Sequence, residues 1–146
     1  MDGHRIRLLG LDFGAKTLGV AVSDELGLTA QALETVYRPR EDKLRQTLAR
    51  VKELTEEYSV SKLILGLPLQ LDGSEGERCV KTREFGVLLE KRTGLPVEYV
   101  DERLTTAQAE RVMKEAGIKG SGLKKYSDEL SAVLILQTYM DLHRQH

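Results

Sequence analysis

The sequence predicts an α/β fold: a mixed five-stranded sheet, three antiparallel strands and then parallel ones, with helices packed around it. Two observations carry this prediction. Near the N-terminus, apolar runs at 6–11 and 18–22 enclose a short polar segment with a glycine, which is typical of two antiparallel strands joined by a turn. Further along, short apolar runs alternate with helical patterns, as in strands that join a sheet in parallel through helical crossovers.

The elements of the first half follow from local patterns. A third strand is expected within 28–37, where Thr, Leu and Val are frequent, and Arg38-Pro39-Arg40 ends it. The apolar run 62–68 has the character of a strand buried on both faces. Between them, one amphipathic helix is predicted from apolar residues three and four positions apart: Leu44, Leu48, Val51, Leu54 and Tyr58.

The second half continues the alternation. A capping-box pattern, Ser74 to Glu77, predicts the start of a helix that ends at Gly94. The expected inner face of this helix consists of Val80, Val87 and Leu88. Another buried strand is predicted at 97–100.

Two further helices complete the predicted order. Thr105 can cap the first of them, with Gln108 three residues later. A glycine-rich, lysine-bearing loop is expected at 117–122. The last helix is predicted to begin near Ser127 or Asp128.

Composition narrows the class of protein. A chain of 146 residues is expected to form a single domain, 1–146. Charged residues make up 31% of the chain but the net charge is −1, so any binding to a polyanion must come from local clusters. The single cysteine, Cys79, excludes an internal disulfide and suits a reducing compartment. With no signal-peptide pattern and no long apolar run, a cytoplasmic protein without membrane contact is expected.

Acidic residues stand at three element boundaries: Asp12, Asp101-Glu102 and Asp128. If the first and fifth strands lie close together, the first two sites meet at one sheet edge, and the last helix can bring Asp128 to them. Three carboxylates at one point need a cation to stay ionised, and oxygen ligands suit Mg²⁺ or Mn²⁺. Each acid also has a simpler interpretation: Asp12 opens a turn, Asp128 complements a helix dipole, and Asp101-Glu102 pairs with Arg103.

Four motifs together resemble the YqgF family, the Holliday-junction-resolvase-like proteins regarded as nucleases for the 5′ end of pre-16S ribosomal RNA. In order they are Asp12-Phe13-Gly14-x-Lys16-x-x-Gly19-Val20-Ala21-Val22, Gly66-Leu67-Pro68 with Asp72-Gly73, Asp101-Glu102-Arg103-Leu104-Thr105-Thr106, and Asp128-x-x-x-Ala132-Val133-x-Ile135-Leu136-Gln137. The resemblance covers almost the whole chain. It implies an RNase H-like fold and metal-dependent cleavage of a nucleic-acid phosphodiester.

The resemblance also implies the metal ligands. They are Asp12, Asp128 and one residue of Asp101-Glu102, since strand alternation lets only one of that pair face the metals. Glu102 is favoured because resolvases of this superfamily commonly place a glutamate just past that strand, and Asp101 is held in reserve.

Cations near the same edge are candidates for binding the substrate. Lys16 lies in the first turn, Arg103 follows the acid pair, and Lys124 and Lys125 precede Asp128. Lysines on a loop suit phosphate contacts without sequence recognition, although ordinary solvated charge explains Lys124 and Lys125 equally well. With 5% aromatic residues and no tryptophan, no stacking platform for single strands is evident.

Other functions are weighed against this one. The first motif also resembles the phosphate loop of sugar kinases, actin and seventy-kilodalton chaperones, but those bind ATP between two domains, and this chain is too short for both. A non-catalytic nucleic-acid-binding module is disfavoured because bare acids repel phosphate. Within the nucleases, processing of precursor ribosomal RNA, free or in ribosomal precursor particles, is preferred. The alternative is Holliday junction resolution, which calls for a two-fold dimer; nothing in the sequence specifies one, and a monomer is favoured.

Overall fold

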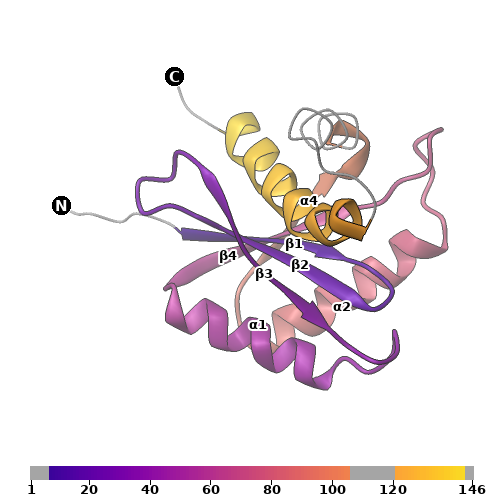
Figure 1. The fold of residues 1–146 in the computed structure, drawn as a ribbon, viewed down its shortest axis with the longest axis horizontal. Helices are drawn as coiled ribbons and strands as arrows, with labels where there is room; N and C mark the ends of the chain where they lie inside the picture. Colours follow the sequence, from indigo (N-terminus) through magenta and orange to yellow (C-terminus); the bar gives the residue numbers. More distant parts are fainter. Residues whose placement is uncertain (1–6, 106–120, 144–146) are drawn as a thin grey trace.

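The computed structural model describes residues 7–105 and 121–143, with side chains in the second segment from Asp128 onward. Its elements (Figure 1) are β1 (Arg7–Phe13), β2 (Thr17–Ser23), β3 (Ala30–Tyr37), α1 (Arg45–Glu57), β4 (Val60–Leu67), α2 (Glu77–Thr93), β5 (Val97–Asp101), the 3₁₀ turn η1 (Glu102–Leu104) and α4 (Ser121–Leu142). The five strands form one sheet in the order β3-β2-β1-β4-β5.

The pairing within the sheet confirms the mixed topology expected from the sequence. β1 pairs antiparallel with β2, which pairs antiparallel with β3. On its other side β1 pairs parallel with β4, and β4 pairs parallel with β5. The carboxyl ends of β1, β4 and β5 therefore meet at one edge of the sheet, where ligands gather in folds of this kind.

Helices cover both faces of the sheet (Figure 1). Alternate residues of β1 divide between two cores, because successive side chains of a strand point to opposite faces. Leu9, Leu11 and Phe13 pack in the core with α1 and α2, whereas Leu8 packs in the core under α4. The same alternation assigns Asp12 to the α4 face.

The amphipathic stripe predicted for α1 is confirmed. Val51 and Leu54 are fully buried, and Leu44, Leu48 and Tyr58 pack against the same core from its margin. On α2 the predicted inner face is wrong, because Val80, Val87 and Leu88 are exposed. The residues that α2 buries instead are Cys79, Thr82, Phe85, Gly86 and Leu89. Thr82 and Gly86 interrupt this stripe, so that hydrophobicity alone does not mark it.

Helix starts also differ from the expectations. The N-cap of α2 is Gly76, without a side-chain hydrogen bond, whereas Ser74 contacts Asp72 Oδ1 at 2.6 Å within the preceding loop. Helix α4 begins at Ser121, earlier than expected, so that Ser121 and Gly122, expected as the end of a loop, are helical; the rest of that loop, 117–120, lies outside the described residues. The helix predicted from Thr105 lies outside the described residues beyond Thr105 itself. Among the helices in the described ranges, none combines the length and apolar character needed to cross a membrane.

Candidate active site

Asp12 lies near the carboxyl end of β1, opposite Gly19 of β2. A side chain at position 19 would collide with the backbone carbonyl of Asp128, so the glycine allows α4 to lie directly on the sheet at this point. The negative charge of Asp128 in turn raises the pKa of Asp12. The first turns of α4 are thereby positioned over the end of β1, and Asp12 and Asp128 come together.

Glu102 reaches Asp12 from the other side. It opens η1 directly after β5, and β4 separates its strand from β1. Gly66 of β4 leaves the space for this crossing, since a Cβ there would lie 3.0 Å from the Cγ of Glu102 and would also overlap Ile135. Side chains of Asp12 and Glu102 then meet in a hydrogen bond.

Both carboxyl groups hold protons more tightly than usual. Burial raises the pKa of Asp12, and the charge of Asp128 adds to the rise, while the hydrogen bond from Glu102 and the charge of Arg78 oppose it. For Glu102, burial first, then the charge of Asp12 and the hydrogen bond to it, raises the pKa to about 8. At neutral pH Glu102 is therefore protonated and donates a hydrogen bond to the Asp12 carboxylate, because two half-buried like charges in contact cannot both ionise without a cation.

Asp101 points to a different partner. Its carboxylate accepts a hydrogen bond from the backbone N–H of Arg103 at 2.9 Å and forms an ion pair with the Arg103 guanidinium at 2.7 Å. These contacts hold the pKa of Asp101 below its usual value. Glu102, and not Asp101, is thus the residue beside Asp12.

The side chains at this edge match a divalent cation in the type of ligand they offer. Asp12 and Glu102 supply adjacent carboxylate oxygens, the ligand type that Mg²⁺ and Mn²⁺ prefer. Without a cation, a proton on Glu102 compensates the negative charge of the pair. Within residues 7–105 and 121–143, however, no three Asp, Glu, His or Cys side chains are grouped so that they could hold a metal ion. The donors fit in kind, and binding a cation requires loss of the proton and a closer approach of the third carboxylate.

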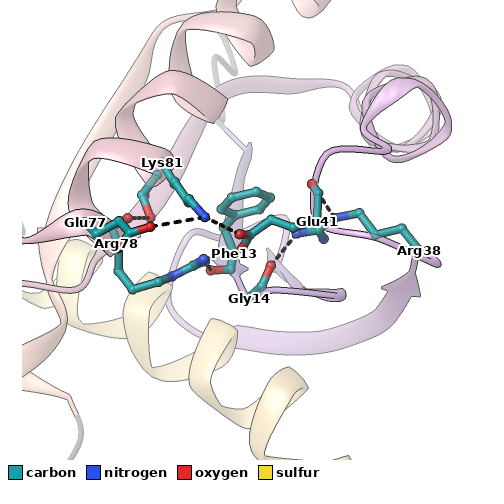
Figure 2. Close-up of polar contacts among 8 residues, drawn as sticks. Phe13, Gly14, Arg38, Glu41, Glu77, Arg78 and Lys81 are labelled. Atoms are coloured by element: carbon teal, nitrogen blue, oxygen red, sulfur yellow. Dashed lines mark hydrogen bonds and ion pairs between the residues drawn. The ribbon is translucent and has the colours of Figure 1, made fainter.

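Arg78 of α2 is the main residue of this edge that the sequence did not single out. Its Nη2 donates to the backbone carbonyl of Phe13 at 3.0 Å, and its guanidinium also forms an ion pair with Glu41 (Figure 2). Lys81 binds the same Glu41 carboxylate at 2.6 Å. The positive charge of Arg78 lowers the pKa values of both Asp12 and Glu102. Its position inside a helical stretch of mixed charges gave no signal of this role.

Arg38 is a second residue that the sequence did not mark as functional. Its side chain is buried, its guanidinium lies 4.5 Å from the centre of the Phe13 ring, and its Nη2 donates to the carbonyl of Gly14 (Figure 2). The sequence marks Arg38 only as part of a strand-ending Arg-Pro-Arg pattern. It instead holds the turn that follows Asp12.

The predicted substrate-binding cations are spread along the edge. Lys16 is exposed in the β1–β2 turn. Arg103 is half-exposed, pairs with Asp101, and donates to the carbonyl of Leu71 in the loop before α2 at 3.4 Å. Lys124 and Lys125 lie within α4 and not on a loop before it, and their side chains are outside the described part of the structure.

Comparison with known proteins decides the family. The profile described as "RuvX: Holliday junction resolvase" matches residues 6–142. The chain belongs to this family. The resemblance to YqgF proteins is therefore confirmed, as is the expectation of an enzyme of the nuclease class.

Relatives match over nearly their whole length. A protein of Agathobacter rectalis named "Putative pre-16S rRNA nuclease" is 56% identical over 136 residues, which cover 93% of this chain and 95% of the relative. A protein of Lactobacillus helveticus with the same name is 49% identical over 142 residues, 96% of this chain and 99% of the relative.

Solved structures support the RNase H-like fold of this RuvX family member. Thermus thermophilus RuvC in complex with a Holliday junction substrate aligns with a TM-score of 0.56 and 18% identity, over 94% of this chain and 96% of RuvC. The large terminase nuclease of the thermophilic phage G20c aligns with a TM-score of 0.51 and 14% identity, over 94% of this chain and 83% of the nuclease.

Proposed function

We propose that this RuvX family member is a divalent-metal-dependent nuclease that hydrolyses a phosphodiester near the 5′ end of precursor 16S ribosomal RNA. One observation carries the proposal: the side chains of Asp12 and Glu102 meet in a hydrogen bond at the edge where the parallel strands end, and the charge of Asp128 acts on Asp12. A buried acid pair of this kind costs stability unless it serves a cation or a reaction.

Asp12, Glu102 and Asp128 are the residues that would hold Mg²⁺ or Mn²⁺. When bound, such ions activate water and stabilise the leaving oxygen in phosphodiester hydrolysis. The three carboxylates supply the charge that retains the ions, and Asp12 is fixed in place by its strand. Arg78 keeps the end of β1 in position through the Phe13 carbonyl and favours the ionised form of both acids.

The proposed substrate rests on the relatives. Proteins 45–56% identical to this chain carry a name that refers to pre-16S rRNA, whereas the family profile carries the name of a junction resolvase. Lys16, Arg103, Lys124 and Lys125 are proposed to bind the phosphate backbone, which needs no sequence recognition. Acting on ribosomal precursors, free or in particles, the protein would work in the cytoplasm, and we propose that it acts as a monomer.

The test is a cleavage assay with two labelled substrates. One is a precursor RNA carrying the 5′ extension of 16S rRNA, and the other is a four-way DNA junction. Each is incubated with the protein in Mn²⁺ or in EDTA, beside Asp12→Asn, which keeps the shape of the side chain but removes its charge. Lys52→Gln on the outer face of α1 is the matched surface control.

We expect cleavage of the RNA in Mn²⁺, none in EDTA, and a loss of at least about a hundredfold in Asp12→Asn, as for groups that stabilise transition-state charge. Lys52→Gln should cut like the parent. Preferential cutting of the junction would replace the RNA substrate with the resolvase function. Equal activity of Asp12→Asn and the parent would show that the cleavage does not come from this site.

A further inference from the structure

The loop from β3 to α1 and the first residues of α1 line an open cavity that the proposed cleavage site does not use. Its volume is about 440 Å³, and the residues that line it include Arg38, Lys43, Arg45, Gln46 and Asp42. Three of these side chains are cationic and one is acidic. Asp42 already pairs with Arg40 at 3.5 Å, so the cavity presents mainly positive charge.

One of the residues that line the cavity, Arg38, has a buried polar atom without a hydrogen-bond partner. Within the described residues, the buried side-chain polar atoms that lack a hydrogen bond are Nη1 of Arg38 and Oγ1 of Thr47. Arg38 is 6% exposed, and its other guanidinium nitrogens donate to the carbonyls of Glu41 and Gly14. An orphaned cationic nitrogen that is this deeply buried is costly unless a ligand or water completes its bonding.

The start of α1 adds a second, independent indication of an anion. Its N-cap, Leu44, offers no side-chain hydrogen bond, and no acidic residue occupies its first turn. The first N–H groups of a helix lack partners inside the helix and carry partial positive charge. Lys43 and Arg45 beside them form no ion pair with any residue that the structure describes, although cations are unfavourable at this end of a helix. A bound anion would accept hydrogen bonds from the first N–H groups of α1 and from Arg38, and would compensate the charges of Lys43 and Arg45.

We propose that this cavity, between Arg38 and the first turn of α1, binds a phosphate group of the nucleic-acid strand close to the cleaved bond. The inference rests on the proposed function for the source of the phosphate. Its proximity to the reaction follows from Arg38, whose guanidinium contacts the carbonyl of Gly14, two residues after Asp12 (Figure 2). Asp12 faces α4, whereas Phe13 and the Arg38 guanidinium above it lie on the opposite face of the sheet, so a strand whose cleaved phosphate lies at Asp12 would pass around the end of β1 to place a further phosphate in the cavity.

The test measures binding without cleavage. The affinity of a fluorescently labelled single-stranded RNA is determined by anisotropy in EDTA, over a range of NaCl concentrations, for the parent and for Lys43→Gln/Arg45→Gln. Arg38 is left unchanged because its bonds hold the loop. Lys91→Gln/Arg92→Gln is the matched control, since it removes the same charge from two exposed residues at the far end of α2. Binding of inorganic phosphate is followed by ³¹P line broadening in the same proteins.

We expect the Lys43→Gln/Arg45→Gln protein to bind RNA about five- to tenfold more weakly at 0.1 M salt, with the slope of log affinity against log salt reduced by about 1. It should also lose the ³¹P broadening, and the control should behave as the parent in both measurements. RNA affinity and salt slope equal to those of the parent would overturn the inference. If only phosphate binding is lost, the cavity takes a free phosphate and the assignment to the substrate strand is wrong.

Failure of this inference can be told apart from failure of the proposed function. Cleavage of the precursor RNA by the parent in Mn²⁺ reports on the function alone. For the Lys43→Gln/Arg45→Gln protein the inference predicts a higher KM with kcat retained. A lower kcat at unchanged KM would contradict it, because the cavity would then influence the reaction without holding the strand.

Discussion

Glu102 donates a hydrogen bond to Asp12 across the full width of β4, over the space that Gly66 leaves open. The contact joins the end of the first strand to the residue that follows the last. It also stores a proton that has to leave before a cation can bind both carboxylates. Several consequences of this arrangement can be measured.

Replacing Glu102 changes the pH dependence of stability. The pKa of Glu102 rises from 4.5 to about 8 on folding, so the unfolded chain releases this proton at lower pH than the folded protein. The contribution of Glu102 to stability is therefore lost as pH rises from about 4.5 to about 8 and is constant outside that window. A shift of this size corresponds to about 4–5 kcal/mol, which screening by solvent at the half-buried pair reduces. We expect Glu102→Gln to be about 2 kcal/mol more stable than the parent at pH 8 in metal-free urea unfolding.

At pH 4 the same variant should match the parent, because Glu102 is then protonated in both states. Glu57→Gln, at the exposed end of α1, serves as the control and should show no such difference at either pH. A Glu102→Gln protein less stable than the parent at pH 8 would mean that the acid pair is not strained.

The glycine under α4 provides a second prediction. In Gly19→Ala the new methyl group meets the backbone of Asp128, which cannot move aside without lifting α4 from the sheet. We expect a loss of about 2–3 kcal/mol in stability, as for overpacked cores, and a loss of most cleavage activity even at temperatures where the protein is folded.

Gly86→Ala is the matched control for this variant. Its methyl group meets the hydroxyl of Tyr99 in the core on the opposite face, away from the acids. It should lower the melting temperature but keep its activity while folded. Equal activity losses in the two variants would show that the position of α4 over Gly19 has no special importance.

Substitutions of the neighbouring acids Asp101 and Glu102 should have different effects on cleavage activity. Asp101→Asn loses an ion pair with Arg103 that is partly exposed, worth about 1 kcal/mol or less, and should retain activity within a few fold. Glu102→Gln should lower the cleavage activity by at least about a hundredfold. The reverse order would transfer the role of ligand to Asp101.

Arg78 should act on the acids through its charge. It lowers the pKa values of Asp12 and Glu102, so Arg78→Met allows both to rise. The ionised carboxylates then form only at higher pH, and the acidic limb of the pH–rate profile should move to higher pH.

Arg83→Met tests whether this effect is specific to Arg78. Arg83 lies on the same helix but pairs with Glu75 at 2.7 Å, and its loss should leave the pH profile unchanged. A lower rate without a shifted profile in Arg78→Met would limit Arg78 to holding the Phe13 carbonyl.

Much of the fold could be predicted from the sequence because its signals are local. The first hairpin, the stripe of α1 and the apolar runs of β4 and β5 each lie in one short window. The order of the strands in the sheet, which places β4 between β1 and β5, was not among these predictions. The inner face of α2 could not be found in this way. Its buried positions include Thr82 and Gly86. These two residues are buried because other parts of the fold pack over them, and not because their side chains are hydrophobic.

The acids of the site could be predicted from element boundaries and motifs, but not the contacts among them. Glu102 reaches Asp12 only because Gly66 happens to lie between their strands, a matter of sheet order. The roles of Arg78 and Arg38 could not be predicted, because each arginine binds a backbone carbonyl at the end of β1 or in the turn after it. Every residue has a backbone carbonyl, so the sequence does not show which one is bound. Contacts of this kind become visible only when the chain is folded.

Calorimetric titration of Mn²⁺ at pH 7 tests the central claim most directly. Repeating it in buffers of different ionisation enthalpy counts the protons released on binding. We expect the parent to bind Mn²⁺ and to release close to one proton, that of Glu102, and we expect Asp12→Asn to bind Mn²⁺ far more weakly. Binding by the parent without proton release, or equal binding by Asp12→Asn, would contradict this claim.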